Sequence, residues 1–213
     1  MKFDAVIFDM DGLLLDTERV SSLANREALL EYGHDLPVEQ FHALAGGTLL
    51  TVAEKLADWT GAKIDAEEFH NKWLLHYNAF LADGPDLRPT VLETLQAVES
   101  QALPKAIATT TAKDHARTKL SKAGIEHRFD SIVGFYCVEK RKPNPDPYLK
   151  AAANLNVDPR ACLAFEDSDT GVKAALAAGM TVVQVPDIAK AEAREAHYRV
   201  ETLIEGLQAV GLQ

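Results

Sequence analysis

The feature that most constrains the fold is an alternation of short apolar runs and helical segments after Pro85. The apolar runs have the length of buried strands, and a segment with helical periodicity separates each run from the next. Strands that alternate with helices are typical of a parallel sheet covered by helices on both faces. The apolar runs are residues 105–109, 131–135, 161–165 and 181–185, and the helical segments are 89–101, 112–123, 145–155 and 169–178.

One further apolar run, FDAVIF at residues 3–8, stands apart from the others. A single strand cannot satisfy its own backbone, so we expect it to join the same parallel sheet. The sequence therefore predicts an α/β protein with a Rossmann-like core.

From Thr17 to about Asp83 the sequence has helical periodicity. Pro37, Thr48 and Asp65 each precede a helix-like stretch, as residues at or beside a helix N-cap do. We therefore expect an all-helical domain that is inserted after the first strand. The expected division is a core of residues 1–15 and 85–213 and a helical domain of residues 16–84.

Composition limits the partners of the chain. Its 22 basic and 32 acidic side chains give a net charge of −10, which disfavours binding to nucleic acid. No apolar run approaches the ~18 residues of a membrane span, and the N-terminus does not read as a signal peptide. Cys137 and Cys162 sit among apolar residues without metal-binding spacing. We expect a cytoplasmic protein with reduced cysteines that is a monomer or weak dimer.

Polar side chains stand where the predicted strands end. Ligands bind at the carboxyl ends of the strands in doubly wound sheets, so these side chains should meet in one crevice. They bring together up to four carboxylates, one amine and several hydroxyls. They are Asp9 and Asp11, Thr109 to Thr111, Lys142, and Glu166 with Asp167.

Four carboxylates cannot share a site without a cation. Oxygen ligands beside a substrate crevice suit Mg²⁺, which also accepts phosphate oxygens as ligands. The spacing of an EF-hand is absent, and no histidine or cysteine stands in zinc-ligand spacing at these positions. Lys142 and the threonine hydroxyls would then face an anion. The residues predict a magnesium site with a phosphate beside it.

Four motifs give the chain a resemblance to a known family. They are FDMDG (8–12), IATTT (107–111), RKPNPD (141–146) and FEDSDTG (165–171). With the helical insertion, they resemble haloacid dehalogenase superfamily hydrolases, of the branch that includes β-phosphoglucomutase and phosphoglycolate phosphatase. The resemblance covers essentially the whole chain and implies a core that is overlaid by a helical cap domain.

The resemblance implies a role for each matched residue. Asp9 would be the nucleophile that forms an aspartyl-phosphate, and Asp11 would exchange a proton with the leaving group and then with water. Thr109 and Lys142 would stabilise the transferring phosphoryl group. The remaining roles are phosphate binding by Asp9, Gly12, Thr109, Thr110 and Lys142, and Mg²⁺ binding by Asp9, the Asp11 carbonyl, Asp167 and Glu166.

Alternatives remain at several of these positions. Lys140 or Arg141 could make the contact assigned to Lys142, since all three lie in one basic stretch. Thr109 could be an ordinary strand residue. Glu166 is a weaker choice of metal ligand than Asp167.

The same resemblance orders the candidate functions. Asp11 favours phosphate-ester chemistry, because the dehalogenases and phosphonate-cleaving relatives lack an acid there. The cap loop at residues 44–50 has Leu49 near the position of the mutase arginine, and Ser21 replaces a mutase histidine. We therefore expect a Mg²⁺-dependent phosphatase of small phosphorylated metabolites. A sugar-phosphate mutase is the first alternative, and a non-catalytic binding protein is the second.

Overall fold

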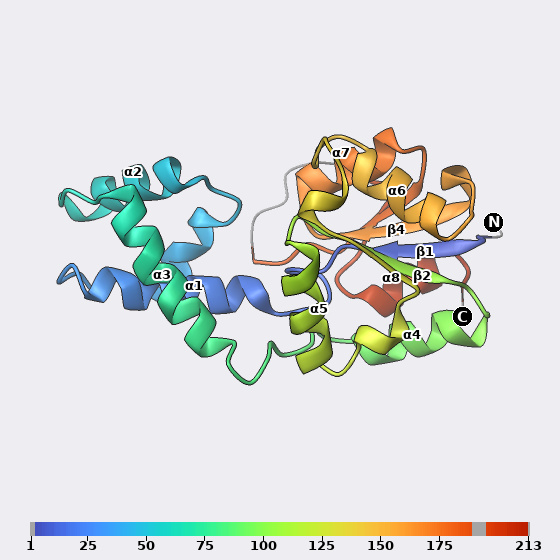
Figure 1. Cartoon of the computed structure of the whole chain (residues 1–213), viewed down its shortest axis with the longest axis horizontal. Coiled ribbons are helices and arrows are strands. Elements are labelled where there is room, and N and C mark those ends of the chain that lie inside the picture. The colour runs from blue at the N-terminus through green and yellow to red at the C-terminus, as the bar shows by residue number, and fades with distance from the viewer. Residues whose placement is uncertain (1–2, 189–194, 213) are drawn as a thin grey trace. The chain divides into compact units, whose positions relative to one another are not determined.

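The computed structural model describes residues 3–188 and 195–212 (Figure 1). The chain divides into two compact units. One unit holds the residues up to Asp16 and from Asp86 onward, and the other is Thr17–Pro85. Within the described ranges, every helix is too short or too polar to cross a lipid bilayer.

In the described part of the first unit, six strands form a parallel sheet in the order β3-β2-β1-β4-β5-β6. The chain leaves β1 to form β2 and β3 on one side, then crosses to form β4 and the later strands on the other. The predicted α/β core is confirmed. The strands are β1 Ala5–Phe8, β2 Lys105–Ala108, β3 Ser131–Val133, β4 Cys162–Glu166, β5 Thr181–Gln184 and β6 Tyr198–Arg199.

Helices cover both faces of this sheet (Figure 1). Alternate residues of β1 point to opposite faces, so Val6 and Phe8 join one apolar cluster while Ala5 and Ile7 join the other. The first cluster includes residues of α4 (Val91–Ser100), α5 (Lys113–Lys122) and α8 (Leu203–Ala209). The second includes residues of α6 (Asp146–Asn154) and α7 (Asp169–Ala177). Short 3-10 helices lie at Glu126–Arg128, Phe135–Cys137 and Pro159–Ala161.

The second unit is all-helical and has a small core of its own. Thr48 caps α2 by accepting a hydrogen bond from the Thr51 N–H, and Asp65 caps α3 through the N–H groups of Glu67 and Glu68. The stretch after Pro37 forms a 3-10 helix. The elements are α1 Thr17–Leu30, η1 Val38–Leu44, α2 Leu49–Thr60 and α3 Ala66–Phe80, and the core is Ala28, Leu29, Phe41, Leu44, Leu56 and Phe69.

The two segments that lead to and from the helical unit are hydrogen-bonded to each other. The Asp16 N–H donates to the Asp86 carbonyl at 2.9 Å, and the Arg88 N–H donates to the Leu14 carbonyl at 2.9 Å. The chain therefore leaves the first unit and returns to it at one place.

Candidate active site

The order of the strands brings the motif residues to one edge of the sheet. Asp9 follows β1 and continues its ladder, with its N–H 3.0 Å from the Phe165 carbonyl of β4. Thr109 follows β2 in the same way, with its N–H 3.0 Å from the Val133 carbonyl. Glu166 is the last residue of β4. Because β1 lies between β2 and β4, Asp9 is flanked by Thr109 on one side and Glu166 on the other.

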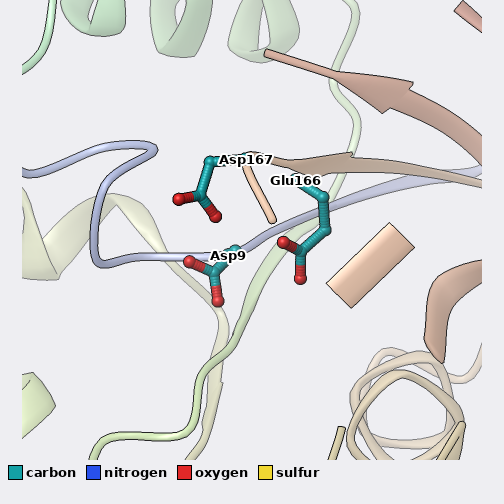
Figure 2. A group of neighbouring side chains, drawn as sticks. All are labelled: Asp9, Glu166 and Asp167. Atoms are coloured by element: carbon teal, nitrogen blue, oxygen red, sulfur yellow. The ribbon is translucent and has the colours of Figure 1, made fainter. Parts of the chain in front are cut away.

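Three carboxylates converge at this edge (Figure 2). Asp9, Glu166 and Asp167 each offer one oxygen, and these oxygens lie within 4.8 Å of one another. Octahedral Mg²⁺ holds its oxygen ligands at about 2.0–2.1 Å, which spaces them roughly 3–4 Å apart. The donor set and its spacing therefore fit a hard divalent cation.

Lys142 is the basic residue that contacts these carboxylates. Its Nζ lies 2.5 Å from Asp9 Oδ1 and also bonds Glu166 Oε1, and only 4% of its side chain is exposed. The two alternatives in the same stretch lie elsewhere. Lys140 is exposed, and the guanidinium carbon of Arg141 lies 3.4 Å from the centroid of the Phe135 ring.

Burial and neighbouring charges shift the pKa values in this group. Burial raises the pKa of Asp9 to about 7, against the opposing charge of Lys142 and with help from Glu166 and Asp11. Burial alone would lower the pKa of Lys142, but the charges of Asp9 and Glu166 outweigh it and raise that pKa above its usual value. Three carboxylates against one ammonium leave an excess of negative charge that a cation would offset.

Glu166 is fixed on several sides. The Tyr148 hydroxyl donates to Glu166 Oε1 at 2.5 Å, and the Ser168 hydroxyl lies 3.2 Å from Oε2. Burial, followed by the charge of Glu166, raises the pKa of Tyr148 well above its usual value, so this hydroxyl remains a donor. A Cβ atom on Gly171 would lie 1.9 Å from the Glu166 carboxyl carbon.

Sequence reasoning missed Tyr148 and Gly171 as supporting residues, although one signal in the sequence pointed to Gly171. The hydroxyl of a buried tyrosine needs a hydrogen-bond partner, but only the structure shows that Tyr148 is fully buried. A glycine within a helical pattern usually has a packing reason, and Gly171 lies in the first turn of α7.

The Asp11 carboxylate lies outside the acidic cluster and has its own partners. Thr111 Oγ1 donates to Asp11 Oδ2 at 2.6 Å, and Lys119 Nζ lies 2.7 Å from Asp11 Oδ1. The sequence did not predict the contact with Lys119. After Asp11 the chain turns sharply at Gly12, whose φ of 80° suits glycine and whose N–H donates to the Leu15 carbonyl at 2.9 Å.

The two threonines predicted to bind phosphate differ in exposure. Thr109 is 3% exposed, and its Oγ1 accepts a hydrogen bond from the Thr111 N–H at 3.0 Å. Its hydroxyl proton is still able to donate to an anion. Thr110 is exposed.

Gln184 of β5 supports the loop that carries Asp167. Its Nε2 donates to the Asp167 carbonyl at 3.4 Å and to Asp169 Oδ1 at 3.1 Å, and its side chain is fully buried. Helix α7 then begins after Ser168, whose hydroxyl accepts from the Gly171 N–H at 3.2 Å. The positive N-terminal end of a helix dipole therefore lies beside the carboxylates.

Comparison with known proteins gives a consistent set of relatives. A family model described as haloacid dehalogenase-like hydrolase matches residues 6–185. A fructose-1-phosphate phosphatase of Escherichia coli is 32% identical over 184 residues, which cover 86% of this chain and 97% of that protein. A phosphorylated carbohydrates phosphatase of Thermotoga maritima is 33% identical over 181 residues, or 83% of this chain and 82% of that protein.

The similarity to one solved structure extends over both units. That structure is a hydrolase of the same family from Deinococcus radiodurans with bound phosphate and sodium, and it matches with a TM-score of 0.87 and 28% identity. The match covers 98% of this chain and 95% of that one.

Proposed function

The chain belongs to the haloacid dehalogenase-like hydrolases, and from this premise we propose that it hydrolyses small phosphorylated metabolites through an aspartyl-phosphate on Asp9. The observation that carries the proposal is the group formed by Asp9, Glu166, Asp167 and Lys142 at the carboxyl edge of the sheet. It combines a nucleophile, a cation site and a fixed ammonium where a phosphoryl group would bind.

In the first half of the proposed reaction, a carboxylate oxygen of Asp9 bonds to phosphorus as the ester P–O bond breaks. Asp11 gives its proton to the departing oxygen, which leaves as an alcohol. In the second half, the oxygen of a water molecule bonds to phosphorus, the water proton passes to Asp11, and the bond between Asp9 and phosphorus breaks. Both aspartates return to their starting state and phosphate is released.

Lys142 and Thr109 bind the phosphoryl oxygens in this proposal. The Lys142 ammonium is already held beside Asp9, so little reorganisation is needed when charge develops on the phosphoryl group. The buried Thr109 hydroxyl has a proton to donate. Gly12 and Thr110 would complete the phosphate site from the turn after β1 and the loop after β2.

Asp9, Asp167, Glu166 and the Asp11 carbonyl are the proposed ligands of Mg²⁺. When bound, the ion would neutralise charge on the phosphoryl oxygens and hold that group in line with Asp9. The spacing of the three carboxylates supports this assignment. Glu166 contributes in a second way, because it also orients Lys142.

Hydrolysis is favoured over phosphoryl transfer to a second sugar site. A mutase must bind a second phosphate, but the sequence has no arginine or lysine between Gly33 and Lys55. Lys55 itself donates to the Ala43 carbonyl at 2.6 Å. In this proposal the predicted helical domain, residues 16–84, is a cap that selects the leaving group.

The proposal also covers the partners, the cellular location and the oligomeric state of the protein. A net charge of −10 disfavours nucleic-acid partners, and we propose a cytoplasmic protein that works without nucleic acid or membrane partners. A monomer or weak dimer is the proposed state in solution, and sedimentation velocity would test it.

The proposal is tested by phosphate release from a panel of phosphorylated metabolites. The panel includes hexose and pentose phosphates, phosphoglycolate, glycerol phosphate and nucleoside monophosphates. We expect release with Mg²⁺, none with chelator, and clear ranking among the substrates. If nothing is released from any substrate by protein that binds Mg²⁺, the hydrolase assignment is wrong. Conversion of a sugar phosphate only after addition of a sugar bisphosphate would identify a mutase instead.

A further inference from the structure

Lys119 makes a specific contact with a proposed catalytic residue from an element outside the family motifs. It lies in the last turn of α5, and its Nζ is 2.7 Å from Asp11 Oδ1. The two residues are 108 positions apart in the sequence. Only 16% of the Lys119 side chain is exposed, whereas Lys113, Arg117 and Lys122 of the same helix are exposed.

The two oxygens of Asp11 have chemically different partners. Oδ1 faces the Lys119 ammonium, which has three donors and no acceptor. Oδ2 faces the Thr111 hydroxyl at 2.6 Å, which donates or accepts as its proton rotates. A proton on Oδ1 would point at an ammonium that cannot accept it. A proton on Oδ2 meets a hydroxyl that can.

We propose that Lys119 is a positioning residue that fixes the rotamer of Asp11 and makes Oδ2 the oxygen that exchanges protons. The inference rests on the proposed function of Asp11. In the first half-reaction the proton leaves Oδ2 for the departing ester oxygen as the P–O bond breaks. In the second half-reaction Oδ2 takes a proton from the attacking water as the bond between Asp9 and phosphorus breaks. Lys119 takes part in neither bond change.

Rapid mixing with two substrates tests this role. One substrate is dinitrophenyl phosphate, whose leaving group, dinitrophenolate, departs from phosphorus without needing a proton. Its release in the first turnover therefore does not depend on Asp11. The other substrate is an alkyl ester such as glycerol phosphate, whose leaving group needs a proton, so its release does depend on Asp11. In Lys119→Met we expect the dinitrophenolate burst rate to stay within about threefold of wild type. Steady-state kcat on the alkyl ester should fall roughly 10- to 100-fold with little change in KM, as expected for a misplaced catalytic group.

Two further variants at the same position separate the charge from the fold. Lys119→Arg keeps a group that only donates, so it should recover most of the lost kcat. Lys119→Gln supplies an amide that also accepts, so it should not. Lys122→Met, on the same helix and exposed, is the matched control and should behave as wild type.

Several results would overturn the inference. If Lys119→Met slowed the dinitrophenolate burst as much as the steady-state turnover of the alkyl ester, the substitution would have damaged the site in general. A raised KM with unchanged kcat would mean that Lys119 binds substrate. Equal behaviour of the arginine and glutamine variants, or wild-type rates in Lys119→Met, would also exclude the role. Wild-type protein that releases no phosphate from any substrate of the panel would overturn the proposed function itself, and this inference with it.

Discussion

Gly171 leaves the space that the carboxylate of Glu166 occupies. An ideal Cβ at this position would lie 1.9 Å from the Glu166 carboxyl carbon, far inside any allowed contact. Glu166 is fully buried and also bonds Lys142 and Tyr148, so it has no exposed position to move to without breaking those bonds. A missing side chain in α7 thus helps to set the orientation of the site lysine.

Gly171→Ala should therefore displace Glu166. We expect a loss of about 1–3 kcal/mol in the free energy of unfolding, as for other overpacked interiors. Activity should fall as well, because Lys142 loses its second carboxylate partner. Chemical denaturation and phosphate release measure the two effects. Lys173→Ala, two residues along the same helix and exposed, is the control. Wild-type stability in Gly171→Ala would contradict the packing argument.

Asp9→Asn should abolish turnover and keep the fold. The amide has nearly the shape of the carboxylate but is not a nucleophile, so we expect kcat to fall at least roughly a thousandfold. Circular dichroism checks the fold, and acid-quenched protein checks for a phosphoenzyme. Asp4→Asn, which changes an exposed carboxylate before the same strand, should keep full activity. Activity near wild type in Asp9→Asn would exclude the covalent mechanism.

Asp11→Asn should slow both half-reactions on alkyl phosphates. Loss of a general acid and base typically costs about 10²–10⁴-fold in rate. Single-turnover measurements would follow formation and loss of the phosphoenzyme separately. Asp114→Asn, on the exposed first turn of α5, serves as the control. Unchanged rates in both steps would remove Asp11 from the proton transfers.

Asp167→Asn should weaken Mg²⁺ binding in the absence of any substrate. A lost carboxylate ligand removes both a bond and a charge, so we expect the dissociation constant to rise about tenfold or more. Calorimetric titration with Mg²⁺ measures it directly. Glu139→Gln makes the same change of charge at an exposed position outside the carboxylate group and should bind as wild type. Unchanged affinity in Asp167→Asn would mean that this side chain is not a ligand.

Asp9 should also give the metal-free protein a characteristic pH dependence. Burial raises its pKa from 3.8 to about 7, so the native state keeps the proton more tightly than the unfolded chain does. The stabilising contribution is complete below about pH 4 and is lost as the pH rises through about 7. Asp9→Asn lacks this titration. In chelator, its melting temperature minus that of wild type should therefore grow from pH 4 to pH 8. A difference that stays constant would contradict the shift.

Strand positions were predictable because apolar runs and the rule for parallel connections determine them. The runs at 105–109 and 161–165 correspond to β2 and β4 within one residue at each end. Strand β6, Tyr198–Arg199, was not predicted, since two residues carry no periodic signal. Helix α8 was missed although Thr202 and Glu205 form a capping box before its apolar residues. That signal was present in the sequence.

The polar contacts around Asp11 and Glu166 could not be predicted from the sequence, for a different reason. Lys119 and Tyr148 reach their partners from α5 and α6, which are distant in the chain. Local patterns show that a helix has a buried face but not which carboxylate a long side chain will meet. The order of the strands in the sheet determines which side chains meet, whereas the sequence alone predicts only which strands exist.

The paired segments beside Leu14 and Arg88 have an evolutionary consequence. Because the backbone hydrogen bonds between them close the first unit behind the insertion, we expect the sheet to tolerate insertions of different length. We expect that the intervening residues can be replaced while the order of the strands and the cluster of three carboxylates stay the same. Preference for a new metabolite can then arise by replacing one contiguous stretch of gene, without re-evolving the chemistry that cleaves the ester.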